Sequence, residues 1–256
     1  MRIGVIGDIH GNFFALEAIT TDAASQGLDG WISVGDLAFK GPMPEEVLAS
    51  LMSLGPVAMV MGNTDEWLVR GFPTSFNPGP DKLARFNKYR EWALERLTQR
   101  GIGLLSGQKA SHEMQLGGQK VLFVHSTPRS MADWIPSSSP DQDMAPMLAG
   151  HDAGVVVCGH IHTPYLRRVE GRTIINTGSA GNPFDGDPRA SYLVLEFGGE
   201  ADSGPDGPDG PDAGLGFAAS IRRVSYDVDR TVVAARERGF PWVEEYAEVL
   251  RRGRGF

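Results

Sequence analysis

Short apolar runs alternate with amphipathic segments over the first 65 residues of the chain. Three nearly uninterrupted apolar runs of strand length occupy residues 2–7, 31–34 and 57–61. Segments with apolar residues at helical spacing lie between them, at 13–26 and 44–54. Strands that are apolar on both faces and alternate with helices are typical of a parallel sheet covered by helices. We therefore predict a βαβαβ unit at the start of the chain.

The middle of the chain is predicted to contain one long helix. A loop rich in Pro, Gly and Asn occupies 71–79, and a helical pattern follows over 81–100. Six basic residues lie along this helix: Lys82, Arg85, Lys88, Arg90, Arg96 and Arg100. The simpler interpretation is a solvated helix face. The alternative is that segment 71–100 forms a helical cap near a cleft and attracts an anionic substrate.

The second half of the chain is richer in strand patterns. Strands are predicted at 119–124, 153–158, 165–169, 172–176, 191–197 and 217–226, and a final helix at 229–239. A turn at Gly171 predicts a hairpin between two of these strands. The Gly/Pro/Asp segment 198–216 cannot bury a core, so we predict a disordered loop there. The whole chain, 1–256, is expected to be a single domain with these two additions.

Charge and composition exclude several classes of protein. The 256 residues carry a net charge of −8 and show no long basic tract, which disfavours a stable nucleic-acid complex. A single cysteine, Cys158, rules out a disulfide framework within the chain and is expected to be a buried, inert thiol. No apolar run approaches the roughly 20 residues of a membrane span. We expect a cytoplasmic protein with no membrane partner.

Candidate metal ligands follow five of the strand-like runs. They are Asp8, His10, Asp36, Asn63, His125, His160 and His162. Chemistry in α/β folds gathers at strand ends, and carboxylates, imidazoles and a carboxamide are ligands for divalent metals. Seven ligands suit two metals if one carboxylate is shared, and two ions about 3.5–4 Å apart can clamp an in-line phosphoryl displacement. The remaining histidines, His112 and His151, lie outside the series and are expected to be ordinary residues.

The ordered series resembles the calcineurin-like metallophosphoesterase superfamily, whose pattern is D-x-H, G-D, G-N-H-[DE], H and G-H-x-H. The resemblance spans Asp8 to His162, about three fifths of the chain. Segments 124–128, 176–181 and 185–192 resemble V-H-G-S-P, N-P-G-S-V-G and D-G-D-P-R-A-S-Y of its small bacterial and archaeal phosphodiesterase branch. The resemblance implies a four-layer α/β/β/α sandwich of two mixed β-sheets flanked by helices.

The resemblance also implies how the ligands divide between two metals. One metal would be held by Asp8, His10, Asp36 and His162, and the second by Asp36, Asn63, His125 and His160. A metal-bridging hydroxide would attack the phosphorus, with Asp36, Asn63 and His125 at the catalytic centre. Manganese is favoured because the set has no thiolate, and iron, zinc, cobalt and nickel are the alternatives.

Two positions depart from motifs of the superfamily. Thr64 stands where G-N-H-[DE] has a histidine that binds the scissile phosphate and can protonate the leaving group. A threonine can donate a hydrogen bond but cannot act as an acid near neutral pH, which favours substrates with good leaving groups. Lys40 stands where some phosphatases of the superfamily have a phosphate-binding arginine, and it supplies charge without bidentate geometry. We expect Asn63, Thr64 and Lys40 to contact the phosphate, although Lys40 can equally be a surface residue beside a turn.

The leading hypothesis is a dinuclear metal-dependent phosphoesterase, more specifically a phosphodiesterase, that acts on a small phosphorylated substrate such as a nucleotide. The alternatives are a dinucleoside polyphosphate hydrolase, a phosphoprotein phosphatase and a catalytically silent scaffold. Segment 71–100 and the loop 126–150 are expected to set specificity. Met131, Trp134 and Ile135 lie in that loop. We expect them at an edge of the core, with stacking on a base or aryl group as the alternative. The sequence leaves the oligomeric state open.

Overall fold

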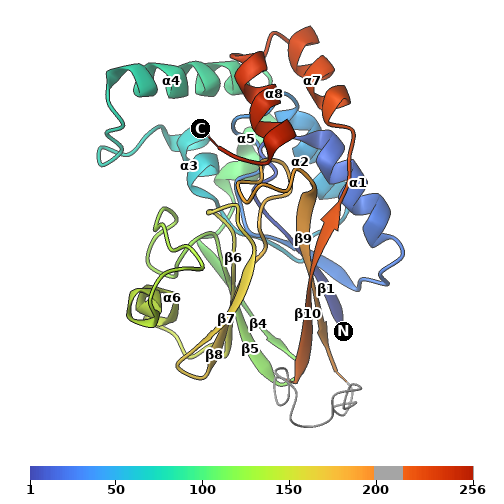
Figure 1. Cartoon of the computed structure of the whole chain (residues 1–256), viewed down its shortest axis with the longest axis vertical. Helices are drawn as coiled ribbons and strands as arrows, with labels where there is room; N and C mark the ends of the chain where they lie inside the picture. The colour runs from blue at the N-terminus through green and yellow to red at the C-terminus, as the bar shows by residue number, and fades with distance from the viewer. Residues whose placement is uncertain (199–215, 256) are drawn as a thin grey trace.

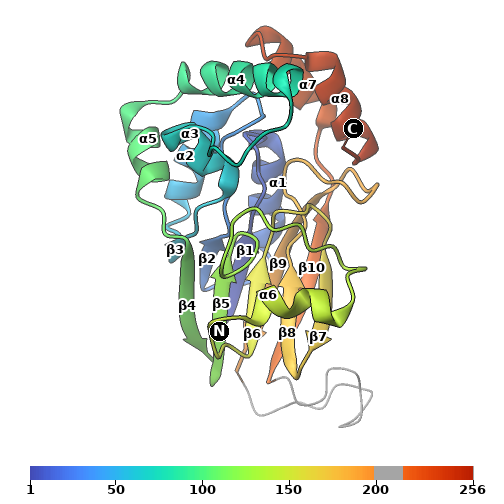
Figure 2. The same cartoon turned by 90° about the vertical axis from the view of Figure 1, so that its left-hand side faces the viewer.

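Two five-stranded sheets face each other in the computed structural model, which describes residues 1–198 and 216–255 (Figures 1 and 2). Sheet A has the order β10-β9-β1-β2-β3. Its strands are β1 (Arg2–Ile6), β2 (Gly30–Ser33), β3 (Ala58–Met59), β9 (Ala190–Phe197) and β10 (Phe217–Val224). Sheet B has the order β4-β5-β6-β8-β7. Its strands are β4 (Ser111–Leu116), β5 (Gln119–Val124), β6 (Val155–Cys158), β7 (Tyr165–Val169) and β8 (Arg172–Asn176).

Both sheets are mixed, with a parallel centre and antiparallel edges. In sheet A, β1, β2 and β3 are parallel, whereas β9 and β10 pair antiparallel. In sheet B, β5, β6 and β8 are parallel, whereas β4 and β7 are antiparallel edge strands. The predicted parallel unit of the first 65 residues is therefore confirmed. The predicted hairpin is also confirmed, because β7 and β8 pair around Gly171 in the left-handed region at φ +77°.

Strand alternation divides the core into three layers. Val5 of β1 faces Phe123 and Val157 of sheet B in the core between the sheets, whereas its neighbour Ile6 faces the helices. The helices that contribute to the core cluster around Ile6 are α1 (Phe13–Ala23), α2 (Pro44–Ser53), α3 (Asn63–Arg70), α4 (Pro80–Leu94), α5 (Gln99–Ser106), α7 (Val228–Glu237) and α8 (Val243–Arg252). Figure 1 shows α1 beside sheet A, and α4 and α8 above the upper end of the sheets. The opposite face of sheet B is covered by the 3₁₀ turn η1 (Asp141–Met144) and by α6 (Ala145–Leu148). This order of layers confirms the predicted α/β/β/α sandwich.

The prediction of one helix over 81–100 is wrong, because the chain forms two helices there. Thr98 caps the second helix: its hydroxyl oxygen accepts from the Gly101 N–H, and its own N–H and hydroxyl donate to Glu45 of α2 at 2.9 and 2.8 Å. An N-cap residue has non-helical backbone angles, so the first helix must end before it. The helices α3 and α8 and the strand β4 were not predicted.

Several basic side chains of α4 and its C-terminal end hold this segment against neighbouring helices. Arg90 donates to the last carbonyls of α3, at Trp67 (2.6 Å) and Leu68 (2.9 Å). Arg96 donates to the Arg238 carbonyl at 3.0 Å, and Arg85 lies 3.9 Å from Glu245. Lys82, Arg85, Lys88 and Arg100 are exposed, as a solvated face predicts, whereas Arg90 and Arg96 are half-buried in contacts with neighbouring segments. A cap function for 71–100 stays a prediction, as does the disordered loop, of which residues 199–215 lie outside the described residues.

Within the described residues, no helix is both long and apolar enough to cross a bilayer.

Candidate metal centre

Five loops at one end of the two sheets bring the predicted ligands together. Asp8 and His10 follow β1, Asp36 follows β2, and Asn63 begins α3 just after β3. From sheet B, His125 follows β5, and His160 and His162 follow β6. Six of the seven side chains are at least nine-tenths buried, and His160 is half-buried. The sandwich therefore assembles the site from both sheets.

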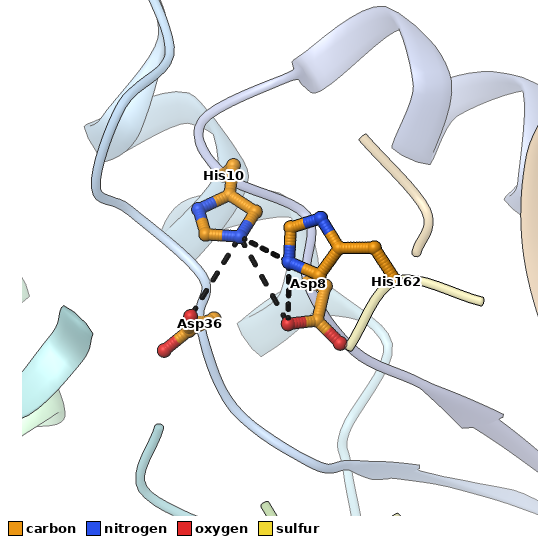
Figure 3. Close-up of side chains that lie close together, drawn as sticks. All are labelled: Asp8, His10, Asp36 and His162. Atoms are coloured by element: carbon orange, nitrogen blue, oxygen red, sulfur yellow. Dashed lines mark hydrogen bonds and ion pairs between the residues drawn. The ribbon is translucent and has the colours of Figure 1, made fainter. Parts of the chain in front are cut away.

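Four of these residues form the first ligand set. Asp8, His10, Asp36 and His162 each offer one ligand atom, and these atoms all lie within 4.8 Å of one another (Figure 3). His162 Nε2 lies 3.2 Å from Asp8 Oδ1 and 3.1 Å from His10 Nε2. The set matches the first metal site implied by the superfamily pattern.

The second set adjoins the first through Asp36. His125 Nε2 lies 3.0 Å from Asn63 Oδ1, 3.3 Å from His160 Nδ1 and 3.5 Å from Asp36 Oδ1. The other carboxylate oxygen, Asp36 Oδ2, lies 3.6 Å from His10 Nε2 in the first set. Asp36 thus presents one oxygen to each set, which is the arrangement that a shared carboxylate requires.

Three backbone carbonyls fix the imidazole tautomers. His10 Nδ1 lies 2.9 Å from the Phe39 carbonyl oxygen, and His125 Nδ1 lies 2.7 Å from that of Val34. His162 Nδ1 faces the Asn182 carbonyl oxygen in the same way. A carbonyl only accepts, so each Nδ1 carries a proton, and each ring in its neutral form presents the Nε2 lone pair to the centre. Histidine ligands of metals are oriented in this way by their second nitrogen.

The resulting contacts place acceptor against acceptor. The His10 and His162 Nε2 lone pairs face each other and Asp8 Oδ1, which has no hydrogen-bond donor among the described residues. His125 Nε2 likewise faces the Asn63 oxygen. Buried acceptors without donors are costly unless a cation lies between them. The donor set therefore fits divalent metal ions.

The backbone of the site is strained where the ligands project. Eight non-glycine residues of the described chain have positive φ, and five of them are predicted metal ligands: Asp8, His10, Asp36, His160 and His162. Left-handed backbone costs a non-glycine residue roughly 1–2 kcal/mol, and such strain concentrates at functional sites. Glycines permit the close approach. A Cβ on Gly62 would lie 2.1 Å from Asp36 Oδ1, and one on Gly159 would lie 2.3 Å from Asp8 Oδ2.

Burial and neighbouring charges favour ligand protonation states that can bind a cation. Burial lowers the pKa of His10 and of His160 to about 4, with His162 and His125 respectively adding to the effect, so both rings are neutral at pH 7. Burial alone would raise the pKa of Asp8, but His162 and the other nearby histidines hold it well below its usual value. The carboxylate is therefore ionised. Burial lowers the pKa of His125, but Asp36 and Asp8 outweigh this and raise it, and the same negative field would attract a metal.

Thr64 lies at the edge of the second set. Its backbone N–H donates to Asp36 Oδ1 at 2.9 Å, while its buried hydroxyl has no hydrogen-bond partner among the described residues. The neighbouring Asp65, which sequence reasoning did not single out, joins two ligand-bearing loops. It accepts from the N–H groups of Leu37 (2.9 Å) and Gly62 (3.3 Å). The acidic position of the G-N-H-[DE] pattern was the signal that could have identified it.

Lys40 is half-buried and turned toward α4. Its Nζ lies 4.2 Å from the centroid of the Phe86 ring, and its backbone has φ +65°. Burial lowers the Lys40 pKa to about 8, and the negative charge of Asp36 opposes this effect. A contact between Lys40 and a phosphate stays a prediction.

Residues predicted to lie outside the site do so. The His151 ring contacts the Met147 carbonyl at 3.0 Å, and His112 packs near Phe123. Cys158 is a buried free thiol, as expected. Surface cavities of about 400 and 390 Å³, one beside the C-terminal segment and one between β3 and α5, are lined by none of the seven ligands. The chemistry of the donors, and not cavity size, identifies the site.

In the loop after β5, the expectation of a core edge holds for only part of the predicted apolar group. Ile135 is buried at 8% exposure, and Met131 is half-buried. Trp134 is 60% exposed, so the prediction that it lies at an edge of the core is wrong. Its ring lies beside His160, with the centroids 5.9 Å apart.

The chain belongs to the calcineurin-like phosphoesterase superfamily, whose domain model matches residues 1–200. Among solved structures, the fold is similar to a metallophosphoesterase from Sphaerobacter thermophilus, with a TM-score of 0.74, 29% identity and coverage of 99% of both chains. A hypothetical protein from Pyrococcus horikoshii has the same fold at a TM-score of 0.78, with 19% identity and 98% of both chains covered. An uncharacterised protein from Methanocaldococcus jannaschii is 26% identical over 250 residues, covering 89% of each chain.

Membership of the superfamily supports a phosphoesterase that requires divalent metal ions.

Proposed function

We propose that this protein is a dinuclear metal-dependent phosphodiesterase. The observation that carries the proposal is the shared position of Asp36, whose two oxygens lie 3.6 Å from His10 Nε2 and 3.5 Å from His125 Nε2. One set of donors on each side of a single carboxylate suits two adjacent ions. When bound, two such ions activate water and stabilise the charge that develops on a phosphoryl group.

The chain's own residues have distinct functions in this proposal. Asp8, His10 and His162 complete the first site, while Asn63, His125 and His160 complete the second. The carbonyls of Phe39, Val34 and Asn182 hold three of the imidazoles in the ligand tautomer. Because these contacts are preformed, little reorganisation is needed when metal and substrate bind.

Thr64 supports the preference for diesters. Its buried hydroxyl has no hydrogen-bond partner in the described part of the chain. It lies beside Asp36 and is available to donate to a phosphate oxygen. It cannot deliver a proton to an alkoxide, as a histidine at this position would. Phosphodiesters and anhydrides with stable leaving groups need this proton least, so they are favoured over alkyl monoesters.

The position of Lys40 does not support the alternative hydrolytic activities. A dinucleoside polyphosphate hydrolase or a phosphoprotein phosphatase would use Lys40 on a phosphate, but its ammonium lies against Phe86. A catalytically silent scaffold does not require seven converging ligands, five of which have a strained backbone conformation. Manganese as the metal, a small phosphorylated substrate such as a nucleotide, and a cytoplasmic location remain part of the proposal.

One substrate panel tests the proposed function. The purified protein is assayed with and without manganese on an aryl diester, an aryl monoester, an alkyl monoester, cyclic nucleotides, a dinucleoside tetraphosphate and a phosphopeptide. We expect metal-dependent hydrolysis with the aryl diester among the best substrates. Faster hydrolysis of the alkyl monoester than of any diester would refute the assignment. A Lys40→Ala variant with unchanged turnover and affinity would remove Lys40 from the phosphate site.

A further inference from the structure

Trp134 is an exposed aromatic side chain next to a predicted metal ligand. It is 60% exposed and is the one aromatic residue among the exposed large apolar side chains of residues 1–198 and 216–255. Its ring meets that of His160 edge to face, with an angle of 75° between the planes. A single exposed apolar residue is ordinary on a protein surface. Trp134 differs from such a residue in two ways: it lies beside the metal centre, and the residues on both sides of it are held by specific contacts.

The two neighbours of Trp134 are both anchored. Asp133 is bound on one side: its carboxylate accepts from Thr127 Oγ1 at 2.9 Å and from Arg129 Nε at 2.8 Å, and its carbonyl accepts from the Ser126 hydroxyl. On the other side Ile135 is buried, and its carbonyl lies 3.3 Å from the Tyr165 hydroxyl. The backbone is therefore held on both sides of Trp134.

One of the anchors connects Trp134 to the metal centre. Ser126 and Thr127 directly follow His125 in the sequence, so the loop that supplies one ligand also positions Trp134 beside another, His160. His162 has an aromatic neighbour too, because Phe184 stacks on it at 4.3 Å. Phe184 is half-buried, whereas Trp134 is exposed.

We propose that Trp134 is a specificity-determining residue that stacks on a flat aromatic ring carried by the phosphate substrate. This inference rests on the proposed function of the site. A tryptophan offers a large, rigid surface at low entropic cost, and its face is suited to a nucleobase or an aryl group. Because Asp133 and Ile135 are anchored, the backbone that carries this surface is positioned before the substrate binds. The substrate class is therefore a phosphate ester with an aromatic ring near the phosphorus.

Binding of matched ligands tests the proposal separately from catalysis. Calorimetry on the manganese-loaded protein compares AMP with ribose 5-phosphate, which shares the sugar and phosphate but lacks the base. Base stacking predicts that AMP binds roughly 5- to 100-fold more tightly. Phenyl phosphate serves as a second aromatic probe, and parallel loss of its affinity in the variants would identify the ring itself as the recognised group.

Substitution of Trp134 should remove the preference for AMP over ribose 5-phosphate and leave the affinity for the sugar phosphate unchanged. In Trp134→Ala the AMP and ribose 5-phosphate affinities should become nearly equal, with ribose 5-phosphate unchanged, and Trp134→Phe should keep most of the preference. Val233→Ala, at an exposed position on α7, serves as the control. An undiminished preference in Trp134→Ala, or none in the natural sequence, overturns the inference while leaving the proposed function intact if hydrolysis persists. Absence of both phosphate binding and hydrolysis overturns the two together.

Discussion

The Nε2 atoms of His10 and His162 lie 3.1 Å apart, and the other nitrogen of each ring faces a backbone carbonyl. With both rings neutral, a proton between the two Nε2 atoms would require one ring to give up its bond to the carbonyl. The lone pairs therefore face each other, together with Asp8 Oδ1, which has no hydrogen-bond partner within residues 1–198 and 216–255. This arrangement stores electrostatic repulsion that a divalent cation would relieve. Without metal, the protein should therefore be less stable than a variant in which these acceptors do not face each other.

Asp8→Asn should separate metal binding from stability. An amide at this position keeps an oxygen for the His160 N–H and turns an N–H₂ toward the His162 lone pair. Without metal at pH 8, the melting temperature should rise by roughly 2–4 °C, as expected for about 1 kcal/mol in a protein of this size. The increase in melting temperature that manganese produces in the natural protein should be absent in Asp8→Asn.

Differential scanning fluorimetry with EDTA or with manganese measures both effects. Asp229→Asn, at an exposed position on α7, should change neither. A metal-free Asp8→Asn protein that is markedly less stable than the natural sequence would show that the facing acceptors are not a source of strain.

Thr64 should control the choice between monoester and diester. Thr64→Val removes the hydroxyl donor and should lower kcat/KM on an aryl diester roughly 10- to 100-fold, the effect of losing a hydrogen bond to a charged group. Thr64→His introduces an acid and should raise the ratio of alkyl monoester to diester turnover at least about tenfold. Metal content should be unchanged in both variants.

Steady-state kinetics on the two substrate types test this pair of variants. The exposed Thr21, which bonds only within α1, provides the control Thr21→Val. Equal activity of Thr64→Val and the natural protein would mean that the orphaned hydroxyl does not contact the substrate.

Asp22 should make stability depend on pH in the acid range. Hydrogen bonds from Arg222 at 2.7 and 2.9 Å and from Tyr192 at 2.7 Å lower the Asp22 pKa in the folded protein. A carboxyl whose pKa is depressed by folding stabilises the protein above its unfolded pKa of about 3.9. This stabilisation is lost as the pH falls through the folded pKa. Asp22→Asn should therefore cost roughly 0.5–1 kcal/mol at pH 7, and the difference should vanish toward pH 2.

Urea unfolding of both proteins at several pH values checks this linkage. In an Arg222→Met background, the Asp22→Asn change should lose most of its pH dependence. If the dependence persists there, the Arg222 pair is not its cause.

The sequence was sufficient to propose candidate ligands but not to predict the groups that orient them. Asp8 and His162 could be predicted because ligand types at strand ends carry a strong local signal. The carbonyls of Phe39 and Asn182 carry none, since every residue has one. The break at Thr98 depends on Glu45 from another helix. The edge strand β4 was missed because its exposed and half-buried residues alternate with weak hydrophobic contrast. The exposure of Trp134 follows from anchors that only tertiary structure reveals.

The metal content of the reconstituted protein tests the central claim most directly. After loading with manganese and removal of free metal, plasma mass spectrometry should find two ions per chain. His125→Ala should retain one ion, because the first set stays complete, and Asp36→Ala should retain less than His125→Ala, because it damages both sets. A single ion per chain in the natural protein, unchanged in His125→Ala, would contradict a two-metal centre built around Asp36.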